Sequence, residues 1–358
     1  MGIVIHGGRV PIRWAQRQSP RPLALAHRYA KEVDCVRIAF INNMPDAALE
    51  DTEMQFFDLL EAASGETPLR IQLYSLPGVP RGERGQQHLE RYYASTDDLW
   101  NRNFDSVIMT GTEPRQPNLK DEPYWPSLGK VLDWAEQNTV STILSCLAAH
   151  AGVLYSDGIA RHPLGDKQFG VFDYERVCEH ALLSGVSSAV QFPHSRWNEV
   201  QEEALSSCGY TVLTKSANAG VDSFVKRKKK SLFVHFQGHP EYSAETLLKE
   251  YKRDIRRFLR GEKETYPSMP QGYFDGAATK ALADFRRNAL DCRHEDRLAN
   301  FPAQLVADGL KSTWRSSATC LYRNWLQYVL SRKAESSAFS TLIRSEHRRP
   351  AAMNNEVA

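Results

Sequence analysis

The sequence lacks paired cysteines and long apolar runs. Its six cysteines occur without a Cys-x-x-Cys pair, which argues against both a zinc ribbon and a disulfide framework. No apolar run approaches the ~18 residues that span a bilayer. Residues 1–5 are too short for the apolar core of a signal peptide. We therefore expect a cytoplasmic protein that binds no metal and no membrane.

A strong net charge is also missing. The chain has 45 Lys and Arg residues against 43 Asp and Glu, a net charge of +2, so no overall field favours a nucleic-acid partner. Internal repeats and low-complexity tracts are missing too, and the 42% hydrophobic content is ordinary for a globular protein. At 358 residues the chain is long enough for one large or two ordinary domains.

Short apolar runs rich in Val, Ile and Phe alternate with segments of helical periodicity. The predicted strands are residues 37–42, 70–76, 104–111, 141–146 and 232–239. The predicted helices between them are residues 47–64, 88–102, 125–138 and 147–155. This alternation predicts an α/β fold with a doubly wound, mostly parallel sheet and right-handed crossovers.

The remaining segments predict additions to this sheet. We expect a hairpin of residues 222–225 and 232–236, helices at 244–260 and 277–290, and a last ordered stretch at 314–330. The Lys-rich run 226–230 is typical of a solvated turn, with a nucleic-acid patch as the alternative. The predicted organisation is an N-terminal extension (1–33), a main domain (34–333) with an insertion (276–312), and a flexible tail (334–358).

One sequence feature combines a strand end with a cysteine. In Ser145-Cys146-Leu147 an apolar run ends at the cysteine, and a helical segment rich in small residues begins at once. Such a nucleophile elbow lifts the side chain above the sheet, and the N–H groups that open the helix can stabilise a thiolate and an oxyanion. A buried, unreactive cysteine is the alternative, since free cysteines are commonly buried.

A second feature supplies the groups that a thiol nucleophile needs. Another predicted strand leads into Gly238-His239-Pro240-Glu241-Tyr242. His239 offers a base, and Glu241 is near enough in sequence to hold one ring nitrogen while the other faces Cys146. Alone, this segment is typical of a turn with surface charges. Together with Cys146 it predicts a Cys-His-Glu triad.

These features resemble the class I glutamine amidotransferase fold, and the wider set of motifs is similar to the homoserine O-succinyltransferase family, which uses that fold. The resemblance extends over residues 37–330. Besides the segments around Cys146 and His239, the matching segments are 43–45, 52–56, 104–111, 124–125, 193–196, 253–254, 314–316 and 324–326.

The resemblance implies acyl transfer through a thioester. Cys146 would attack an acyl-CoA, with His239 as the base and Glu241 orienting it, and the hydroxyl of homoserine or a relative such as serine would then take the acyl group. The backbone N–H of Leu147 would contribute to the oxyanion hole. Acyl-CoA is a co-substrate in this scheme, so no cofactor is expected. We also expect a homodimer.

Two further residues match family positions that contact the substrate, Ser195 and Arg253. A guanidinium at Arg253 suits the carboxylate of an amino acid. The alternative for Arg253 is a buried ion pair with a neighbouring acid. The family also has two lysines after Met-Pro, where this chain has Asp46 and Ala47, so a positive contact near the site is missing.

The acyl donor is left open between succinyl-CoA and acetyl-CoA. In the family, the position of Arg115 is associated with this choice: a small residue leaves room for the succinyl chain, and an acidic residue excludes its carboxylate. A guanidinium at this position can pair with that carboxylate, so we predict succinyl-CoA. The alternative is that Arg115 points to solvent or pairs with Glu113 or Asp121.

Other functions on the same fold stay open. An O-acetyltransferase or a serine O-acyltransferase differs only in donor or acceptor. A glutamine amidotransferase-like thiol hydrolase usually has an elbow that reads Gly-x-Cys-x-Gly, whereas this chain has Leu144 and Ala148 at the glycine positions. A non-catalytic binding protein has no need of a complete triad.

Overall fold

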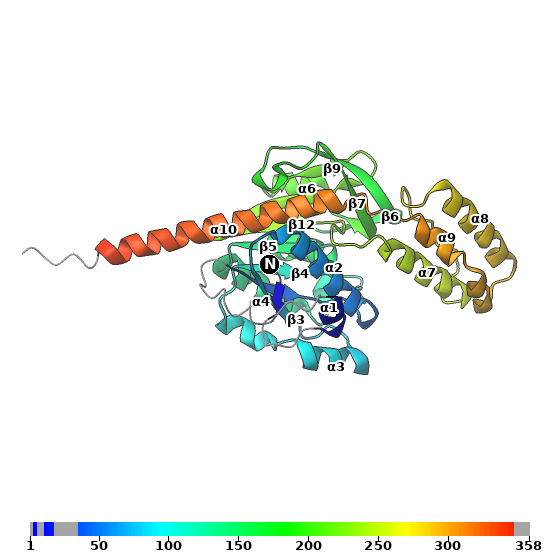
Figure 1. Cartoon of the computed structure of the whole chain (residues 1–358), viewed down its shortest axis with the longest axis horizontal. Coiled ribbons are helices and arrows are strands. Elements are labelled where there is room, and N and C mark those ends of the chain that lie inside the picture. The colour runs from blue at the N-terminus through cyan, green and yellow to red at the C-terminus, as the bar shows by residue number, and fades with distance from the viewer. Residues whose placement is uncertain (1–2, 6–10, 18–34, 347–358) are drawn as a thin grey trace, which may run out of the picture.

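An eight-stranded sheet forms the centre of the computed structural model, which describes residues 3–5, 11–17 and 35–346 (Figure 1). In sheet order its strands are β1 (Ile3–Ile5), β3 (Leu69–Tyr74), β2 (Val36–Ile41), β4 (Ser106–Met109), β5 (Ser141–Ser145), β12 (Ser231–Phe236), β11 (Ser223–Lys228) and β8 (Thr211–Val212). Neighbours from β1 to β12 are parallel, and β11 and β8 are antiparallel. The five strands predicted for this sheet are confirmed.

Helices cover both faces of this sheet. On one face lie α1 (Ile12–Arg17), α2 (Asp46–Ser64) and α10 (Arg315–Glu346), and on the other lie α4 (Trp125–Asn138) and α5 (Leu147–Asp157). Alternate residues of β2 show why both faces are apolar. Ile38 and Phe40 pack into the cluster that holds α2 and α10, whereas Ala39 and Ile41 pack against α4 and α5. The predicted doubly wound α/β architecture is confirmed.

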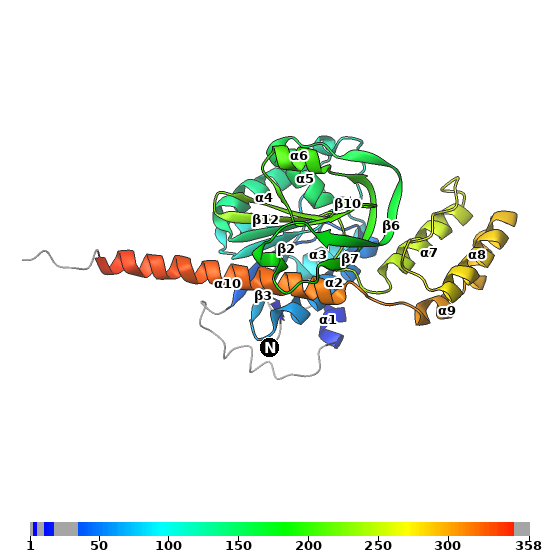
Figure 2. The ribbon, with the colours of Figure 1, turned by 90° about the horizontal axis from the view of Figure 1, so that it is seen from above.

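A second, four-stranded antiparallel sheet lies beside the first (Figure 2). Its order is β10 (Gly220–Val221), β9 (Thr214–Ser216), β6 (His162–Arg176) and β7 (Ala189–Glu199). The short helix α6 (Glu202–Ser207) follows β7. The sequence did not predict this sheet, because much of β6 is exposed and Pro163, Gly165 and Gly170 interrupt its strand pattern.

Three helices form a lobe at one side of the molecule: α7 (Thr246–Leu259), α8 (Gly276–Asp291) and α9 (Ala303–Asp308) (Figures 1 and 2). The predicted helices at 244–260 and 277–290 correspond to α7 and α8. On the opposite side α10 projects beyond the body of the fold. We expected a flexible tail from residue 334, whereas α10 continues to Glu346, a stretch without Gly or Pro. Residues 347–358 lie outside the described residues.

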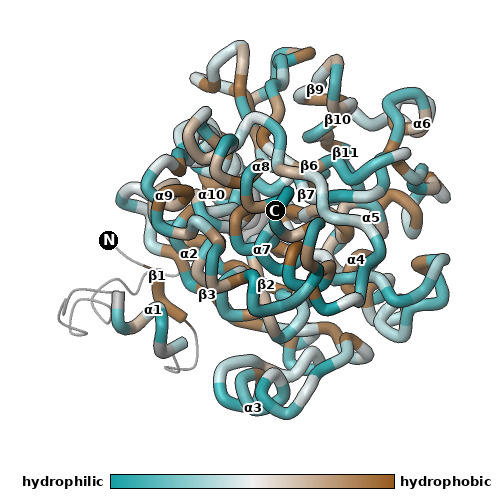
Figure 3. Tube along the Cα trace, turned by 90° about the vertical axis from the view of Figure 1, so that its right-hand side faces the viewer, coloured by the Kyte–Doolittle hydropathy of each residue, from teal (hydrophilic) through white to brown (hydrophobic). Residues whose placement is uncertain are grey.

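The predicted helix at 88–102 was wrong in its bounds. The structure has α3 (Glu83–Tyr92) and a separate 3₁₀ helix (Thr96–Asn101). Ser95 separates them, because its hydroxyl accepts a hydrogen bond from the N–H of Asp97 and so starts a new helical turn. Figure 3 shows α3 in mostly hydrophilic colours at the periphery, where Gly85 and Tyr92 are its buried residues.

The Lys-rich run is also placed differently from the prediction. Strand β11 continues through Lys228, and the turn is confined to Lys229 and Lys230. Lys226 and Lys228 share one face of the strand, and their ammonium groups lie 2.6 and 3.3 Å from the carboxylate of Asp157 at the end of α5. These ion pairs explain the extended conformation of a basic segment.

The N-terminal extension contributes to the fold where the structure describes it. Residues 12–17 form the short helix α1, and residues 3–5 add the edge strand β1 parallel to β3. Trp14 of α1 packs edge-on against Phe57 of α2, with ring centroids 5.3 Å apart. Among the described residues, none of the helices is both long and apolar enough to cross a membrane.

Candidate active site

Cys146 lies at the sharp turn between β5 and α5. Its backbone has φ 53° and ψ −114°, a region that a residue with a Cβ rarely occupies and that costs roughly 1–3 kcal/mol. The N–H of Cys146 donates to the carbonyl of Phe236 (2.7 Å), and α5 begins at the next residue. The predicted nucleophile elbow is therefore present, and Cys146 is only half-buried.

The adjacent strand supplies the histidine. Strand β12 pairs in parallel with β5, and Phe236 is in register with Ser145, so both chains leave the sheet at the same edge. His239 is nearly buried, and its Nδ1 lies 2.7 Å from Oε1 of Glu241. The charge of Cys146 acts on the same ring and favours its protonated form. The three residues predicted as a triad thus lie together.

The electrostatics of the His239 ring favour its protonated form. Burial alone would lower its pKa, but the charges and hydrogen bonds of Cys146 and Glu241 together raise the pKa well above its ordinary value. Glu241 is 3% exposed, and within the described structure its Oε2 has no hydrogen-bond partner. Its Oε1 binds His239 at 2.7 Å and also accepts a longer hydrogen bond from the hydroxyl of Ser145 (3.4 Å). Tyr242 stacks on the ring at a centroid distance of 4.1 Å.

The loop after β4 approaches the start of α5 closely. A Cβ on Gly111 would lie 2.6 Å from Cβ and 2.9 Å from the backbone nitrogen of Leu147. The N–H of Gly111 donates to the carbonyl of Ser145 (3.1 Å), which fixes the loop beside the nucleophile. The N–H of Leu147 opens α5, where no intrahelical acceptor exists for it, so it is free to bind an oxyanion.

A polar cluster surrounds Glu250 on α7, and sequence reasoning identified only part of it. Ser195 on β7 donates to Oε2 of Glu250 (2.5 Å), and Tyr242 donates to Oε1 (2.7 Å). Lys167 and Arg253 each have a nitrogen 3.7 Å from Oε2. Lys167 and Glu250 were missed because a single charged residue on an irregular strand or an amphipathic helix carries no local signal.

Arg253 lies in this cluster and is also paired. Its guanidinium contacts Asp254 at 3.0 Å, so an ion pair with a neighbouring acid exists, but it is exposed rather than the buried pair given as the alternative. The side chain stays 47% exposed, which leaves it accessible to a ligand. Because Tyr242 contacts both the His239 ring and Glu250, the Glu250 cluster lies one side chain away from the triad.

Arg115 lies on an exposed part of the loop between β4 and α4. Its backbone N–H and that of Gln116 donate to Oε1 of Glu122 at 2.5 and 2.8 Å, and Glu122 is 2% exposed. Within the described structure, the Arg115 side chain forms no ion pair with Glu113 or Asp121. Pairing with either acid is therefore not observed, whereas the exposed position agrees with the other alternative, that Arg115 points to solvent.

Two arginines that sequence reasoning missed lie near Asp46 and near Cys146. Arg81 pairs with Asp46, which stands at one of the two lysine positions of the family, at 3.3 Å and donates to Ser75. Arg161 is half-buried and makes no hydrogen bond or ion pair with the described residues. Burial lowers its pKa, against the opposing charges of Tyr124, Glu122 and Cys146, which places Arg161 in the electrostatic field of the thiol.

Comparison with known proteins shows the family of the chain. The family model described as "HTS: Homoserine O-succinyltransferase" matches residues 21–336. The chain belongs to this family. A homoserine O-succinyltransferase from Rhodopseudomonas palustris is 46% identical over 81% of this chain and 87% of its own length. Another from Methylorubrum extorquens is 42% identical over 84% of this chain and 88% of its own.

A solved structure also resembles this member of the homoserine O-succinyltransferase family. It is a glutamine amidotransferase from Methylobacillus flagellatus, 14% identical, with a TM-score of 0.45 over 82% of this chain and 95% of that chain. A likeness at this level carries no conclusion about activity.

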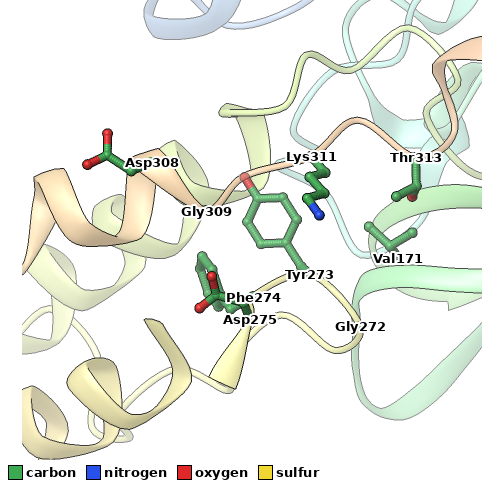
Figure 4. A pocket seen from close by; sticks show the side chains of 9 residues that line it. All are labelled: Val171, Gly272, Tyr273, Phe274, Asp275, Asp308, Gly309, Lys311 and Thr313. Carbon is green, nitrogen blue, oxygen red and sulfur yellow. The ribbon is translucent and has the colours of Figure 1, made fainter. Parts of the chain in front are cut away.

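The family member also has a separate cavity of about 280 Å³ between β6 and the helical lobe. Figure 4 shows Tyr273, Asp275 and Lys311 among its lining side chains, and none of the predicted site residues lines it. In the part of the chain that the structure describes, His, Cys, Asp and Glu side chains form no group of three or more that could hold a metal ion.

Proposed function

We propose that this protein is a CoA-dependent O-acyltransferase that transfers a succinyl group from succinyl-CoA to the hydroxyl of L-homoserine through a thioester on Cys146. The observation that carries the proposal is a cysteine in a strained elbow beside a His239–Glu241 pair, in a chain of the homoserine O-succinyltransferase family. The family assignment favours acyl transfer over a glutamine amidotransferase-like thiol hydrolase or a non-catalytic binding protein.

The first half-reaction loads the enzyme. The thiolate of Cys146 adds to the thioester carbonyl, and the N–H of Leu147 stabilises the developing oxyanion. The bond between the carbonyl carbon and the CoA sulfur then breaks. The departing CoA thiolate takes the proton from Nε2 of His239, because Nδ1 is held by Glu241 at 2.7 Å. Succinyl-Cys146 and a neutral imidazole remain.

The second half-reaction transfers the succinyl group from Cys146 to homoserine. The hydroxyl oxygen of homoserine attacks the acyl carbon while the neutral His239 takes the hydroxyl proton. The bond between the acyl carbon and Sγ breaks, and the ester is released. Cys146 is again a thiolate beside a protonated His239. The charges of Cys146 and Glu241 favour this protonated state of the His239 ring.

The Glu250 cluster is suited to the amino-acid end of the acceptor. A carboxylate of homoserine matches the half-exposed guanidinium of Arg253, and its ammonium group matches the carboxylate of Glu250. Ser195 and Tyr242 hold the carboxylate of Glu250 in place with hydrogen bonds of 2.5 and 2.7 Å. The hydroxyl at the other end of homoserine can then point back past Tyr242 toward the triad.

Donor choice depends on a cation for the distal carboxylate of the succinyl group. Arg115 is the first candidate, since its side chain is exposed and forms no ion pair with Glu113 or Asp121. Arg161 is a second candidate, because the charge of Cys146 acts on it and the described residues offer it no partner. An acetyl group has no such carboxylate, so it gains nothing from either residue.

The test is steady-state release of CoA with succinyl-CoA or acetyl-CoA as donor and homoserine or serine as acceptor. The proposal expects the highest kcat/KM for succinyl-CoA with homoserine. A preference for acetyl-CoA would change the donor, and a preference for serine would change the acceptor, while both would keep the thioester route. Hydrolysis of glutamine, without any acyl transfer from either donor, would overturn the proposal. The homodimer and the cytoplasmic location stay predictions.

A further inference from the structure

A buried network of charged and polar side chains lies behind the loop that carries His239. Its members are His194 and Arg196 on β7, Asp222 just before β11, and Tyr174 on β6. His194 and Asp222 are 0% exposed and Arg196 is 3% exposed. The proposed mechanism uses none of them, and burying a charge is costly unless it is compensated. Their arrangement therefore needs an explanation.

Hydrogen bonds define the state of His194. Nε of Arg196 donates to Nδ1 of His194 (3.2 Å), so Nδ1 accepts and the ring proton is on Nε2. Nε2 lies 2.7 Å from the hydroxyl of Tyr174 and 3.5 Å from Oδ1 of Asp222. The neutral imidazole thus separates a buried cation from a buried anion. Burial, the charge of Arg196 and the charge of His239 lower the pKa of His194 well below its ordinary value.

Arg196 has no other counter-charge at contact distance. Its guanidinium donates to the carbonyls of Asn198 (2.8 Å) and Ala219 (2.7 Å), and the described carboxylates make no ion pair with it. Asp222, on the far side of the His194 ring, balances its charge. The groups that face Asp222 from other elements are His194, Thr214 at 3.4 Å and the N–H of Gly238.

Asp222 and Pro193, the residue before His194, hold three consecutive peptides at the end of β12. The N–H of Gln237 donates to the carbonyl of Asp222 (2.9 Å), and the N–H of Gly238 donates to its carboxylate (2.8 Å). The N–H of His239 donates to the carbonyl of Pro193 (2.9 Å). A Cβ on Gly238 would lie 2.6 Å from Nε2 of His194 and 2.7 Å from Oδ1 of Asp222, so the network touches this peptide directly.

We propose that Asp222 and His194 are positioning residues for His239. Asp222 holds the N–H groups of Gln237 and Gly238, which lead into His239, and balances the charge of Arg196 across the His194 ring, so that the protonated His239 ring stays paired with Cys146. Without the charge of Asp222, the buried guanidinium would repel the imidazolium. Without its oxygen, the Gly238 peptide would lose its anchor. The proposal rests on the proposed function only in taking Cys146 as nucleophile and His239 as its base.

The experiment uses Asp222→Asn and His194→Gln in the full chain. Alkylation of Cys146 by iodoacetamide is followed across pH by mass spectrometry of the Cys146 peptide, beside kcat and KM for both substrates. For Asp222→Asn we expect the pH of half-maximal reactivity to rise by roughly one unit, a tenfold change in the ion-pair equilibrium. We expect kcat of Asp222→Asn to fall about tenfold with KM nearly unchanged. In His194→Gln the pH of half-maximal reactivity should also rise and kcat should also fall.

His235→Gln is the matched control. His235 is also a buried histidine, 1% exposed, on the same strand β12, but it stacks on Phe224 rather than holding residues 237–239. It should lose stability without a shift in the alkylation profile. If Asp222→Asn does not fold, Thr214→Val should give a smaller shift in the same direction. This variant deletes the 3.4 Å hydrogen bond to Asp222, together with the bonds of the Thr214 hydroxyl to the hydroxyl (2.6 Å) and the N–H (3.1 Å) of Ser223.

Parental alkylation profiles in Asp222→Asn and His194→Gln, or in Thr214→Val where it replaces the first, would overturn the positioning role. Alkylation does not need an acyl donor. A shifted profile in a protein that fails to use succinyl-CoA would therefore keep this proposal and overturn only the proposed function.

Discussion

Glu241 forms its shortest hydrogen bond, 2.7 Å, with the ring of His239. Replacing Glu241 with Gln keeps the shape of the pair but removes the charge that helps to raise the pKa of His239. We expect that pKa to fall, and kcat to fall less than in His239→Ala, for which a loss of about 10²- to 10⁴-fold is expected. NMR titration of the ring and steady-state assays check this. An unchanged His239 titration would remove Glu241 from the mechanism.

Arg115 tests donor recognition at the same scale. A buried charge pair that loses one partner costs roughly 2–5 kcal/mol, and about 1.4 kcal/mol corresponds to a factor of ten. Because Arg115 is exposed in the absence of donor, we expect the lower end, about a tenfold loss of kcat/KM for succinyl-CoA in Arg115→Ala, with acetyl-CoA use unchanged. Arg161→Ala is the matched variant. A loss confined to Arg161→Ala would transfer the role to Arg161.

The triad could be predicted from sequence because its residues stand next to strand ends, where an elbow and a following turn are visible as local patterns. Glu250 and Lys167 could not be predicted in this way. They meet only because β6 of the second sheet brings Lys167 to within 3.7 Å of a helix that begins far along the chain. A charged residue at a single position in the sequence does not reveal such a long-range contact, which becomes visible only in the tertiary structure.

At the scale of elements, the loop after β4 and the first turn of α5 depend on each other. In Gly111→Ala the added Cβ would lie 2.9 Å from the backbone nitrogen of Leu147, so either the loop or the oxyanion donor must move. A displacement of about 1 Å at such a group can cost 10²-fold in rate. We expect kcat/KM to fall at least tenfold with a small change in Tm. Gly276→Ala, where a Cβ meets nothing within 4 Å, is the control and should keep parental activity.

The two sheets differ in how readily the sequence reveals them. Strands of the large sheet are buried on both faces, as β4 and β12 show, and so appear as short runs rich in apolar residues. Strand β6 is exposed along much of its length, and its pairing with β7 shifts register after Pro163. Its conformation depends on long-range pairing rather than on a local pattern, which is why the prediction stopped at the main sheet.

At the scale of the whole molecule, buried histidines make stability depend on pH. Burial lowers the pKa of His150 and of His235 to about 3, and that of His194 well below its usual range, so all three bind a proton only on unfolding near pH 5. Burial raises the pKa of Asp222 to about 6, so Asp222 binds a proton in the folded state and offsets one of them. His239, with its raised pKa, is protonated in both states below pH 6.

On unfolding near pH 5 these groups therefore bind about two additional protons. As the pH is lowered from 6 to 4.5, the free energy of unfolding should fall by roughly 3 kcal/mol per pH unit. Urea unfolding at several pH values measures this slope. In His235→Gln one of the three protons is lost, so the slope should decrease by about 1.4 kcal/mol per unit. An equal slope in the parent and the variant would contradict a neutral, buried His235.

The central claim is that the acyl group rests on Cys146, and intact-protein mass spectrometry tests it most directly. After incubation with succinyl-CoA alone, the mass of the protein should rise by one succinyl group, and the increase should disappear when homoserine is added. Cys146→Ala, a small change at a half-buried position, should stay folded, gain no mass and lose acyl transfer. Transfer near the parental rate in Cys146→Ala, with no acyl group on the protein, would contradict the account.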